Sequence, residues 1–158
     1  MSELDVGRRT FLRTGATVAA VAALVAAGVM SPRRVFAAWP EAAFKAEELE
    51  AALEALYGER GPQESAAIRL KAPEIAENGA VVPITVEADL AAVASIAILV
   101  ENNPLPLAAR FLFGEGTLPQ ASTRIKMGKT SGVYAVAETA DGVYVAKKEV
   151  KVTIGGCG

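Results

Sequence analysis

The residue best suited to covalent chemistry is the single cysteine, Cys157, which lies one position from the end of the 158-residue chain. Gly155 and Gly156 precede it and Gly158 follows it. Glycine has no Cβ, so its backbone adopts both signs of φ without a steric penalty. Four extended residues span at most about 13–14 Å, so a thiol on such a tail can reach a cleft in another protein. The tail therefore has the geometry of a flexible carrier arm, with Cys157 as its attachment point.

Nothing in the C-terminal tail activates this thiol. The pKa of a free thiol lies near about 8.5, and the neighbouring C-terminal carboxylate favours the neutral form. The chain contains no histidine that could act as a general base. Reactivity would then come from the site of another protein that receives the arm. We therefore expect a substrate scaffold for other enzymes and not an enzyme.

The composition also limits the kinds of site that this chain can build. With no histidine and one cysteine, it cannot assemble a Cys/His zinc site, a haem attachment motif, a Ser-His-Asp triad or a Cys-His dyad. We expect no cofactor and no metal ion. The length suits one domain with a substantial core in addition to a leader.

The first 37 residues have the features of an export signal. Arg8 and Arg9 precede an uncharged stretch, residues 15–30, that is rich in alanine and valine. This pattern resembles a bacterial twin-arginine signal, and its 16 uncharged residues fall short of the roughly 20 that span a bilayer. Small side chains precede a possible cleavage point after Ala37. We expect removal of residues 1–37 and a periplasmic location for the mature protein.

Removal of the leader makes the protein more acidic. The whole chain has a formal net charge of −2 and the leader contributes +3, which leaves −5 for the remainder. An acidic domain without a basic run has no electrostatic surface for nucleic acid or for an anionic membrane. We therefore expect neither as a partner.

The rest of the chain is expected to fold as one helix followed by short strands. Apolar residues recur at steps of three and four over residues 41–57, and Gly58 follows, which predicts one amphipathic helix. From residue 68 the apolar period is two, which predicts about seven strands. They are residues 68–71, 82–87, 95–101, 109–113, 122–126, 133–139 and 143–154. This pattern is typical of an immunoglobulin-like antiparallel β-sandwich. The expected organisation is a leader (1–37), a helix with a sandwich (38–154) and a carrier arm (155–158).

Two local features add detail to these strands. Pro83 lacks a backbone N–H, which predicts an edge strand or a bulge at that position. Asp141-Gly142 separates two alternating runs, which predicts a hairpin with a type I′ turn.

The residues alone leave two functions open. A single cysteine in an exported protein indicates either a functional thiol or intermolecular pairing. The first is the carrier arm. The second is an immunoglobulin-like periplasmic assembly or adhesion module that forms an interchain disulfide through Cys157.

The C-terminal sequence, residues 150–158, resembles that of the SoxY family, the sulfur carriers of the thiosulfate-oxidising Sox system. The similarity extends through residues 103–111, 123–126 and 133–138 and includes the twin-arginine leader. The Gly-Gly-Cys-Gly ending is the specific feature of this resemblance, whereas the strand pattern alone is not specific. The family commonly has two glycines after the cysteine, whereas Gly158 alone follows it here.

This resemblance implies a particular set of partners and carried groups. The chain would pair with SoxZ, a leaderless subunit that is exported with it. The haem enzyme SoxAX would conjugate Cys157 oxidatively to thiosulfate, and the hydrolase SoxB would release sulfate. Where it is present, SoxCD would oxidise the remaining sulfane sulfur. The carried species would be a cysteine S-thiosulfonate and a persulfide.

Two other groups of side chains are expected to have no site role. Basic residues at strand ends are usually solvated surface and not an anion site. The aromatic residues near the helix are expected to form a face buried on the sandwich or on SoxZ. The first group is Arg110, Arg124 and Lys126, and the second is Trp39, Phe44 and Tyr57.

Overall fold

The computed structural model describes residues 39–153, so the expected leader and carrier arm lie outside the described residues. The chain divides into two units, Met1–Trp39 and Pro40–Gly158, and every described helix and strand belongs to the second. These elements are α2 (Glu41–Lys45), α3 (Leu49–Tyr57), β1 (Gln63–Glu64), β2 (Ile68–Lys71), β3 (Ile75–Ala76), β4 (Val82–Ala88), β5 (Val93–Val100), β6 (Leu107–Leu112), β7 (Gln120–Ile125), β8 (Ser131–Thr139) and β9 (Val143–Val152). Neither described helix is long and apolar enough to cross a membrane.

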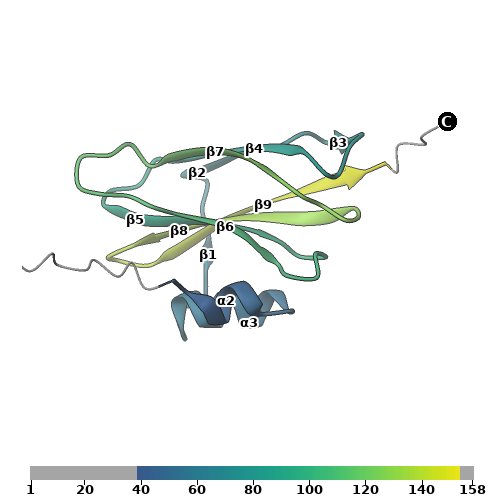
Figure 1. Ribbon diagram of the computed structural model, residues 1–158. Helices are drawn as coiled ribbons and strands as arrows, with labels where there is room; N and C mark the ends of the chain where they lie inside the picture. Colours follow the sequence, from purple (N-terminus) through teal and green to yellow (C-terminus); the bar gives the residue numbers. More distant parts are fainter. Residues whose placement is uncertain (1–38, 154–158) are drawn as a thin grey trace, which may run out of the picture. The chain divides into compact units, whose positions relative to one another are not determined.

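The seven longer strands form an antiparallel β-sandwich (Figure 1). The smaller sheet has the order β2-β4-β7, and the larger sheet contains β9-β8-β5-β6. This division of the strands is typical of immunoglobulin-like sandwiches. The expected fold class is confirmed, and each of the seven predicted strands is present within a few residues of its predicted bounds.

Two further strands, β1 and β3, escaped the sequence analysis. Each has two residues and pairs in parallel with the ten-residue strand β9. An alternating pattern needs about four residues to be recognised, so strands this short leave no periodic signal. β3 is important for the position of the carrier arm, because it pairs with the last residues of β9.

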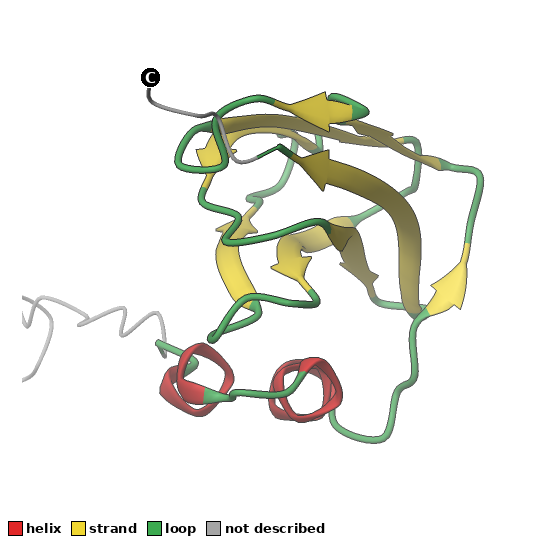
Figure 2. Cartoon of the chain, turned by 90° about the vertical axis from the view of Figure 1, so that its right-hand side faces the viewer, coloured by secondary structure: helices red, strands yellow, loops and turns green. Residues whose placement is uncertain are grey.

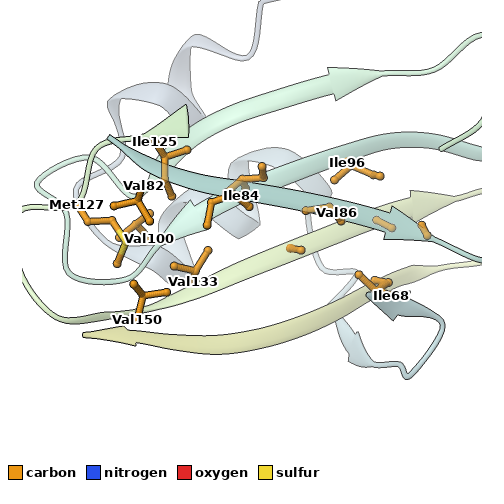
Figure 3. Packing of buried hydrophobic residues seen from close by; sticks show 14 of the residues in the cluster. Ile68, Val82, Ile84, Val86, Ile96, Val100, Ile125, Met127, Val133 and Val150 are labelled. Atoms are coloured by element: carbon orange, nitrogen blue, oxygen red, sulfur yellow. The ribbon is translucent and has the colours of Figure 1, made fainter. Parts of the chain in front are cut away.

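The alternation of side chains along the strands produces the core between the sheets. In β4, Val82, Ile84 and Val86 are buried, while Pro83 between them is exposed. Figure 3 shows Val82 close to Val100, Met127, Val133 and Val150 at one end of this core. Burying a valine or isoleucine side chain contributes about 1.5–3 kcal/mol. Val150 is fully buried and therefore anchors the last part of β9.

The prediction of one helix over residues 41–57 is wrong. Ala46 and Glu48 have extended backbones, and they separate α2 from α3. Figure 2 shows the two helices side by side against the larger sheet. Ala43 of α2 and Ala52 of α3 both pack on its outer face, against apolar side chains such as Val136. Both helices bury apolar side chains on the larger sheet, and this tertiary packing overrides the helical periodicity of the sequence.

The prediction for Pro83 is also wrong, because β4 is the central strand of its sheet. The register remains regular through Pro83, which pairs with Arg124 of β7. The pairing of β4 with β2 ends at Thr85, opposite Lys71. Pro83 therefore has one neighbouring strand, and its missing N–H removes no hydrogen bond to β2.

The hairpin between β8 and β9 is confirmed, but its turn is not of type I′. Neither Asp141 nor Gly142 has a positive φ. The hydroxyl of Thr139 accepts hydrogen bonds from both of their N–H groups, each at 3.2 Å. The side chain of Thr139 thus closes the turn, and left-handed residues are not required.

Candidate functional site

The predicted site residues Gly155, Gly156, Cys157 and Gly158 lie outside the described residues, as do Arg8 and Arg9 of the export signal. The structure does describe the point at which the arm leaves the sandwich. We call residues Lys151, Val152 and Thr153 the arm root. They are the end of β9 and the residue that follows it.

Hydrogen bonds hold the arm root on both sides. On the β3 side, the N–H of Lys151 donates to the carbonyl of Glu74 at 2.9 Å. The N–H of Thr153 donates to the carbonyl of Ala76 at 3.1 Å. On the other side, the N–H of Val152 donates to the hydroxyl of Thr130 at 3.0 Å. The chain is therefore fixed as far as Thr153, four residues before Cys157.

Close packing by the loop after β3 also holds the arm root. The carbonyl of Gly79 accepts a hydrogen bond from the N–H of Met127 at 2.7 Å. A Cβ at position 79 would overlap the carbonyl oxygen of Met127 and lie 2.9 Å from Cγ1 of Val152. Only glycine permits this approach without movement of the backbone. The loops before β4 and before β8 thus meet against the arm root.

Charges of both signs surround this end of the sandwich. Four basic side chains here are exposed and form no ion pair with another described residue. They are Arg124, Lys126, Lys129 and Lys151. Three exposed carboxylates, Glu74, Glu77 and Glu149, nearly balance them. Arg124 and Lys126 are solvated surface, as expected.

Arg110 differs from that expectation, because it belongs to a partly buried ion network at the other end of β8. Its guanidinium donates to Glu138 at 3.1 Å and to the hydroxyl of Ser95 at 3.3 Å. Glu138 also accepts hydrogen bonds from Arg60 at 2.7 Å and from Ser95 at 3.0 Å. The sequence contains Glu138 but does not show that it lies next to Arg110. A carboxylate already occupies this guanidinium, so Arg110 is not an anion site.

Glu138 is the carboxylate that accepts hydrogen bonds from Arg60, Ser95 and Arg110 in this network. Burial opposes ionisation of its carboxyl, but the hydrogen bonds from Arg60 and Ser95 and the charge of Arg110 outweigh burial and hold its pKa below the usual value. A carboxyl whose pKa is lowered by folding stabilises the protein above its unfolded pKa. That stability is lost as the pH falls through the folded pKa.

We expect Glu138→Gln to lower the free energy of unfolding by about 2 kcal/mol near neutral pH, since it leaves two guanidinium groups without their carboxylate. The difference from the wild type should shrink as the pH falls below about 4, where the wild-type carboxyl is also protonated. Urea denaturation of the variant and the wild type, near neutral pH and below about pH 4, measures the difference in the free energy of unfolding. Glu87→Gln is the control, because its partners Arg69 and Lys71 are exposed and its loss should be clearly smaller. Equal losses at both pH values for Glu138→Gln would contradict the prediction.

Two of the three aromatic residues near the helices have structural roles. Tyr57 is buried and Phe44 is half-buried, and both belong to the cluster between the helices and the larger sheet. Burial raises the pKa of Tyr57, with the charge of Arg110 opposing this rise. Trp39 is largely exposed in this chain, and its burial on SoxZ, the other expectation, stays a prediction. Among residues 39–153, no three metal-ligating side chains cluster together.

Comparison with known proteins identifies one family. The family model described as sulfur oxidation protein SoxY matches residues 53–157, a range that includes Cys157. The solved structure of the sulfur carrier protein SoxY from Chlorobium limicola f thiosulfatophilum is 41% identical, with a TM-score of 0.62. The match covers 68% of this chain and 97% of that chain.

A second structural similarity is weak. A chain from a structural study of T cell specificity and activation by the bacterial superantigen toxic shock syndrome toxin-1 is 11% identical, with a TM-score of 0.41. That match covers 56% of this chain and 100% of that chain. It is too distant to support an argument. No curated protein matches the chain.

Proposed function

Because the chain belongs to the SoxY family of sulfur oxidation proteins, we propose that it is a covalent carrier of sulfur intermediates in periplasmic thiosulfate oxidation. Cys157 is the attachment point, and the three neighbouring glycines form the arm. One observation carries the proposal: the family match extends over Cys157, and this thiol follows a strand end that is fixed at Thr153. A fixed root with a short glycine arm suits a group that other proteins must reach.

The first step of the proposed cycle loads the arm. A sulfur–sulfur bond forms between the Cys157 sulfur and the outer sulfur of thiosulfate. The thiol gives its proton to water, and two electrons pass to the haem enzyme SoxAX. The product is a cysteine S-thiosulfonate. The chain supplies only the thiol and its position, since no described residue near the arm root is a histidine base.

The second step releases sulfate. Water attacks the terminal sulfone sulfur in the site of the hydrolase SoxB, and the bond between this sulfur and its neighbour breaks. Sulfate and two protons leave, and a persulfide anion remains on Cys157. This step transfers no electrons to an external acceptor. An enzyme of the SoxCD type would then oxidise the sulfane sulfur where such an enzyme is present.

The proposed assembly is a heterodimer with SoxZ, which leaves the cytoplasm with this chain through the twin-arginine pathway. Arg8 and Arg9 supply the signal, and the family membership supports the partner. SoxAX, SoxB and SoxCD are transient partners that act on the arm in turn. The chain is then their substrate scaffold and not an enzyme.

The test of this function uses a carrier that is loaded chemically. The Cys157 thiolate attacks a central sulfur of tetrathionate, forms the S-thiosulfonate and releases thiosulfate, so no enzyme or further oxidant is needed. SoxB is then added to the loaded heterodimer. We expect one sulfate per loaded cysteine and a persulfide on Cys157, measured by ion chromatography and peptide mass spectrometry. A loaded carrier that SoxB leaves unchanged would overturn the proposal.

The glycine arm gives a further prediction. Gly156→Val retains the thiol but adds a branched side chain beside it, which obstructs a narrow channel and restricts φ. We expect conversion by SoxB to slow by about tenfold, equivalent to about 1.4 kcal/mol in the barrier. Chemical loading with tetrathionate should proceed at the wild-type rate, which serves as the internal control. Unchanged conversion by SoxB would remove the steric role of Gly156.

A further inference from the structure

The loop between β7 and β8, residues 126–130, binds the arm root through one side chain. The N–H groups of Lys151 and Thr153 donate to backbone carbonyls, whereas the N–H of Val152 donates to the hydroxyl of Thr130 at 3.0 Å. A substitution of the accepting residue leaves a backbone carbonyl in place but can remove a hydroxyl. Thr130 is therefore the accepting side chain on which the position of the arm root depends.

Two asparagine side chains from the turn after β5 hold this loop. The amide of Asn103 donates to the carbonyl of Lys126 at 2.7 Å and accepts from the N–H of Gly128 at 3.1 Å. The amide of Asn102 donates to the carbonyl of Thr130 at 3.1 Å. Hydrogen bonds thus connect both asparagines, through the β7–β8 loop, to the residue that binds the arm root.

The loop depends on these bonds because it lies between two strands. Met127 within it is buried in the core (Figure 3), and Ser131 at the start of β8 is also buried. Residues 128–130 between them are exposed. Backbone polar groups outside the strand ladders must find partners elsewhere. The asparagines therefore fix the exposed part of the loop, which is the part that carries Thr130.

Position 103 requires the chemistry of an amide as well as its shape. An amide both donates and accepts, so one side chain satisfies a carbonyl and an N–H together. Aspartate has the same shape, but its ionised carboxylate only accepts. It would keep the bond from Gly128 and place a negative charge against the carbonyl oxygen of Lys126. Asn103→Asp thus removes one bond without a change of size.

Release of the arm root would weaken transfer from the arm. The ends of a strand open at a low free energy, so the loss of one hydrogen bond there shifts a large part of the population to the open form. An enzyme that binds the carrier with its root fixed then binds only the fixed fraction. Its apparent affinity falls in proportion to that fraction, while the chemistry of the bound complex is unchanged.

We propose that Asn103 is a positioning residue for the carrier arm and that it acts through the hydroxyl of Thr130. This inference rests on the proposed function. It adds to that function the residues that determine where the arm begins. It predicts that enzymes acting on the cargo lose affinity, and not turnover at saturation, when either residue loses its hydrogen bond.

The first measurement is amide hydrogen exchange at Val152 in the SoxZ heterodimer. We expect exchange to accelerate by about two- to tenfold in Asn103→Asp and in Thr130→Val. Thr130→Ser retains the hydroxyl and should exchange at nearly the wild-type rate. The double variant Asn103→Asp with Thr130→Val should exchange no faster than Thr130→Val alone, because both changes act through the same bond.

The second measurement is conversion of the same variants by SoxB after loading with tetrathionate. We expect KM to rise about threefold with kcat unchanged in Asn103→Asp and in Thr130→Val. Thr117→Val is the matched control. Its hydroxyl donates to the carbonyl of Gly114, in a loop beside the start of β5, whereas the β7–β8 loop lies beside its end. Loading with tetrathionate should proceed at the wild-type rate in every variant.

The outcomes separate this inference from the proposed function. A wild type that SoxB converts, together with variants whose KM is unchanged, would overturn the positioning role and leave the carrier function standing. Unchanged exchange at Val152 in Asn103→Asp, or additive effects in the double variant, would overturn action through Thr130. Equal losses in Thr117→Val would also overturn it, because the effect would not be local.

A wild type that SoxB does not convert would overturn the carrier function and the inference with it. Urea midpoints establish that each variant is folded. If Asn103→Asp does not fold, Asn103→Ser takes its place with the same expected result.

Discussion

Replacing Cys157 by serine is expected to abolish thiosulfate-dependent sulfate formation, to the level of cells that lack the protein. Serine has nearly the same size as cysteine, but its oxygen cannot form the sulfur–sulfur bond that holds the cargo. Cys157 is the fourth residue after the hydrogen-bonded Thr153, so we expect folding and pairing with SoxZ to be unchanged. Sulfate production by cells and the urea midpoint of the purified heterodimer are the two measurements.

Lys151→Gln is the matched control for this substitution. Lys151 is exposed, forms no ion pair with another described residue and lies on the same strand end. It should retain nearly wild-type turnover. If Cys157→Ser left thiosulfate oxidation unchanged and only removed a reducible dimer from a gel, the cysteine would serve an interchain disulfide instead.

The second large effect is expected for Gly79→Ala. The new Cβ would overlap the carbonyl oxygen of Met127 and press on Val152, and backbone cannot yield as a flexible side chain can. Such overpacking costs about 1–3 kcal/mol, so we expect the free energy of unfolding to fall by about 2 kcal/mol. The strain falls on the arm root, so amide hydrogen exchange at Val152 and Thr153 should also accelerate.

Gly128→Ala is the matched control, in the adjoining loop. A Cβ at position 128 meets no atom within 4 Å, and Gly128 does not have a positive φ. The free energy of unfolding of the Gly128→Ala variant should stay within about 0.5 kcal/mol of the wild-type value. Urea denaturation of both variants measures these free energies of unfolding. Equal stabilities for the two alanine variants would show that the loop before β4 adjusts freely and does not fix the arm root.

The strands were predictable because their signal is local. Val82, Ile84 and Val86 alternate with polar or exposed residues, and this period alone places them on one face of a strand. The helix break at Ala46 was not predictable, since helical periodicity continues through it. The break depends on the area of the larger sheet that two helices must cover, which only the tertiary structure defines. β3 was missed for a related reason, because its two residues are a strand only through pairing with β9.

In the candidate site, too, the local features are predictable from the sequence and the tertiary contacts are not. The glycine arm and Cys157 are visible in the sequence, because the chemistry resides in residue types that are adjacent along the chain. The fixation of the arm root is not visible there, since Ala76 and Gly79 come from one distant segment and Thr130 from another. Arg110 could not be assigned correctly for the same reason. Glu138, which neutralises it, lies 28 residues away and is brought near by the pairing of β5 with β6 and β8.

The central claim is that Cys157 carries sulfur in the cell. The most direct test is the intact mass of the protein from cells grown on thiosulfate, measured with and without a mild reductant and followed by mapping of the C-terminal peptide. We predict reductant-labile additions of sulfur or thiosulfate that are confined to the peptide containing Cys157. A population that holds only free thiol and disulfide-linked dimer under these conditions would contradict the carrier function and favour the assembly module.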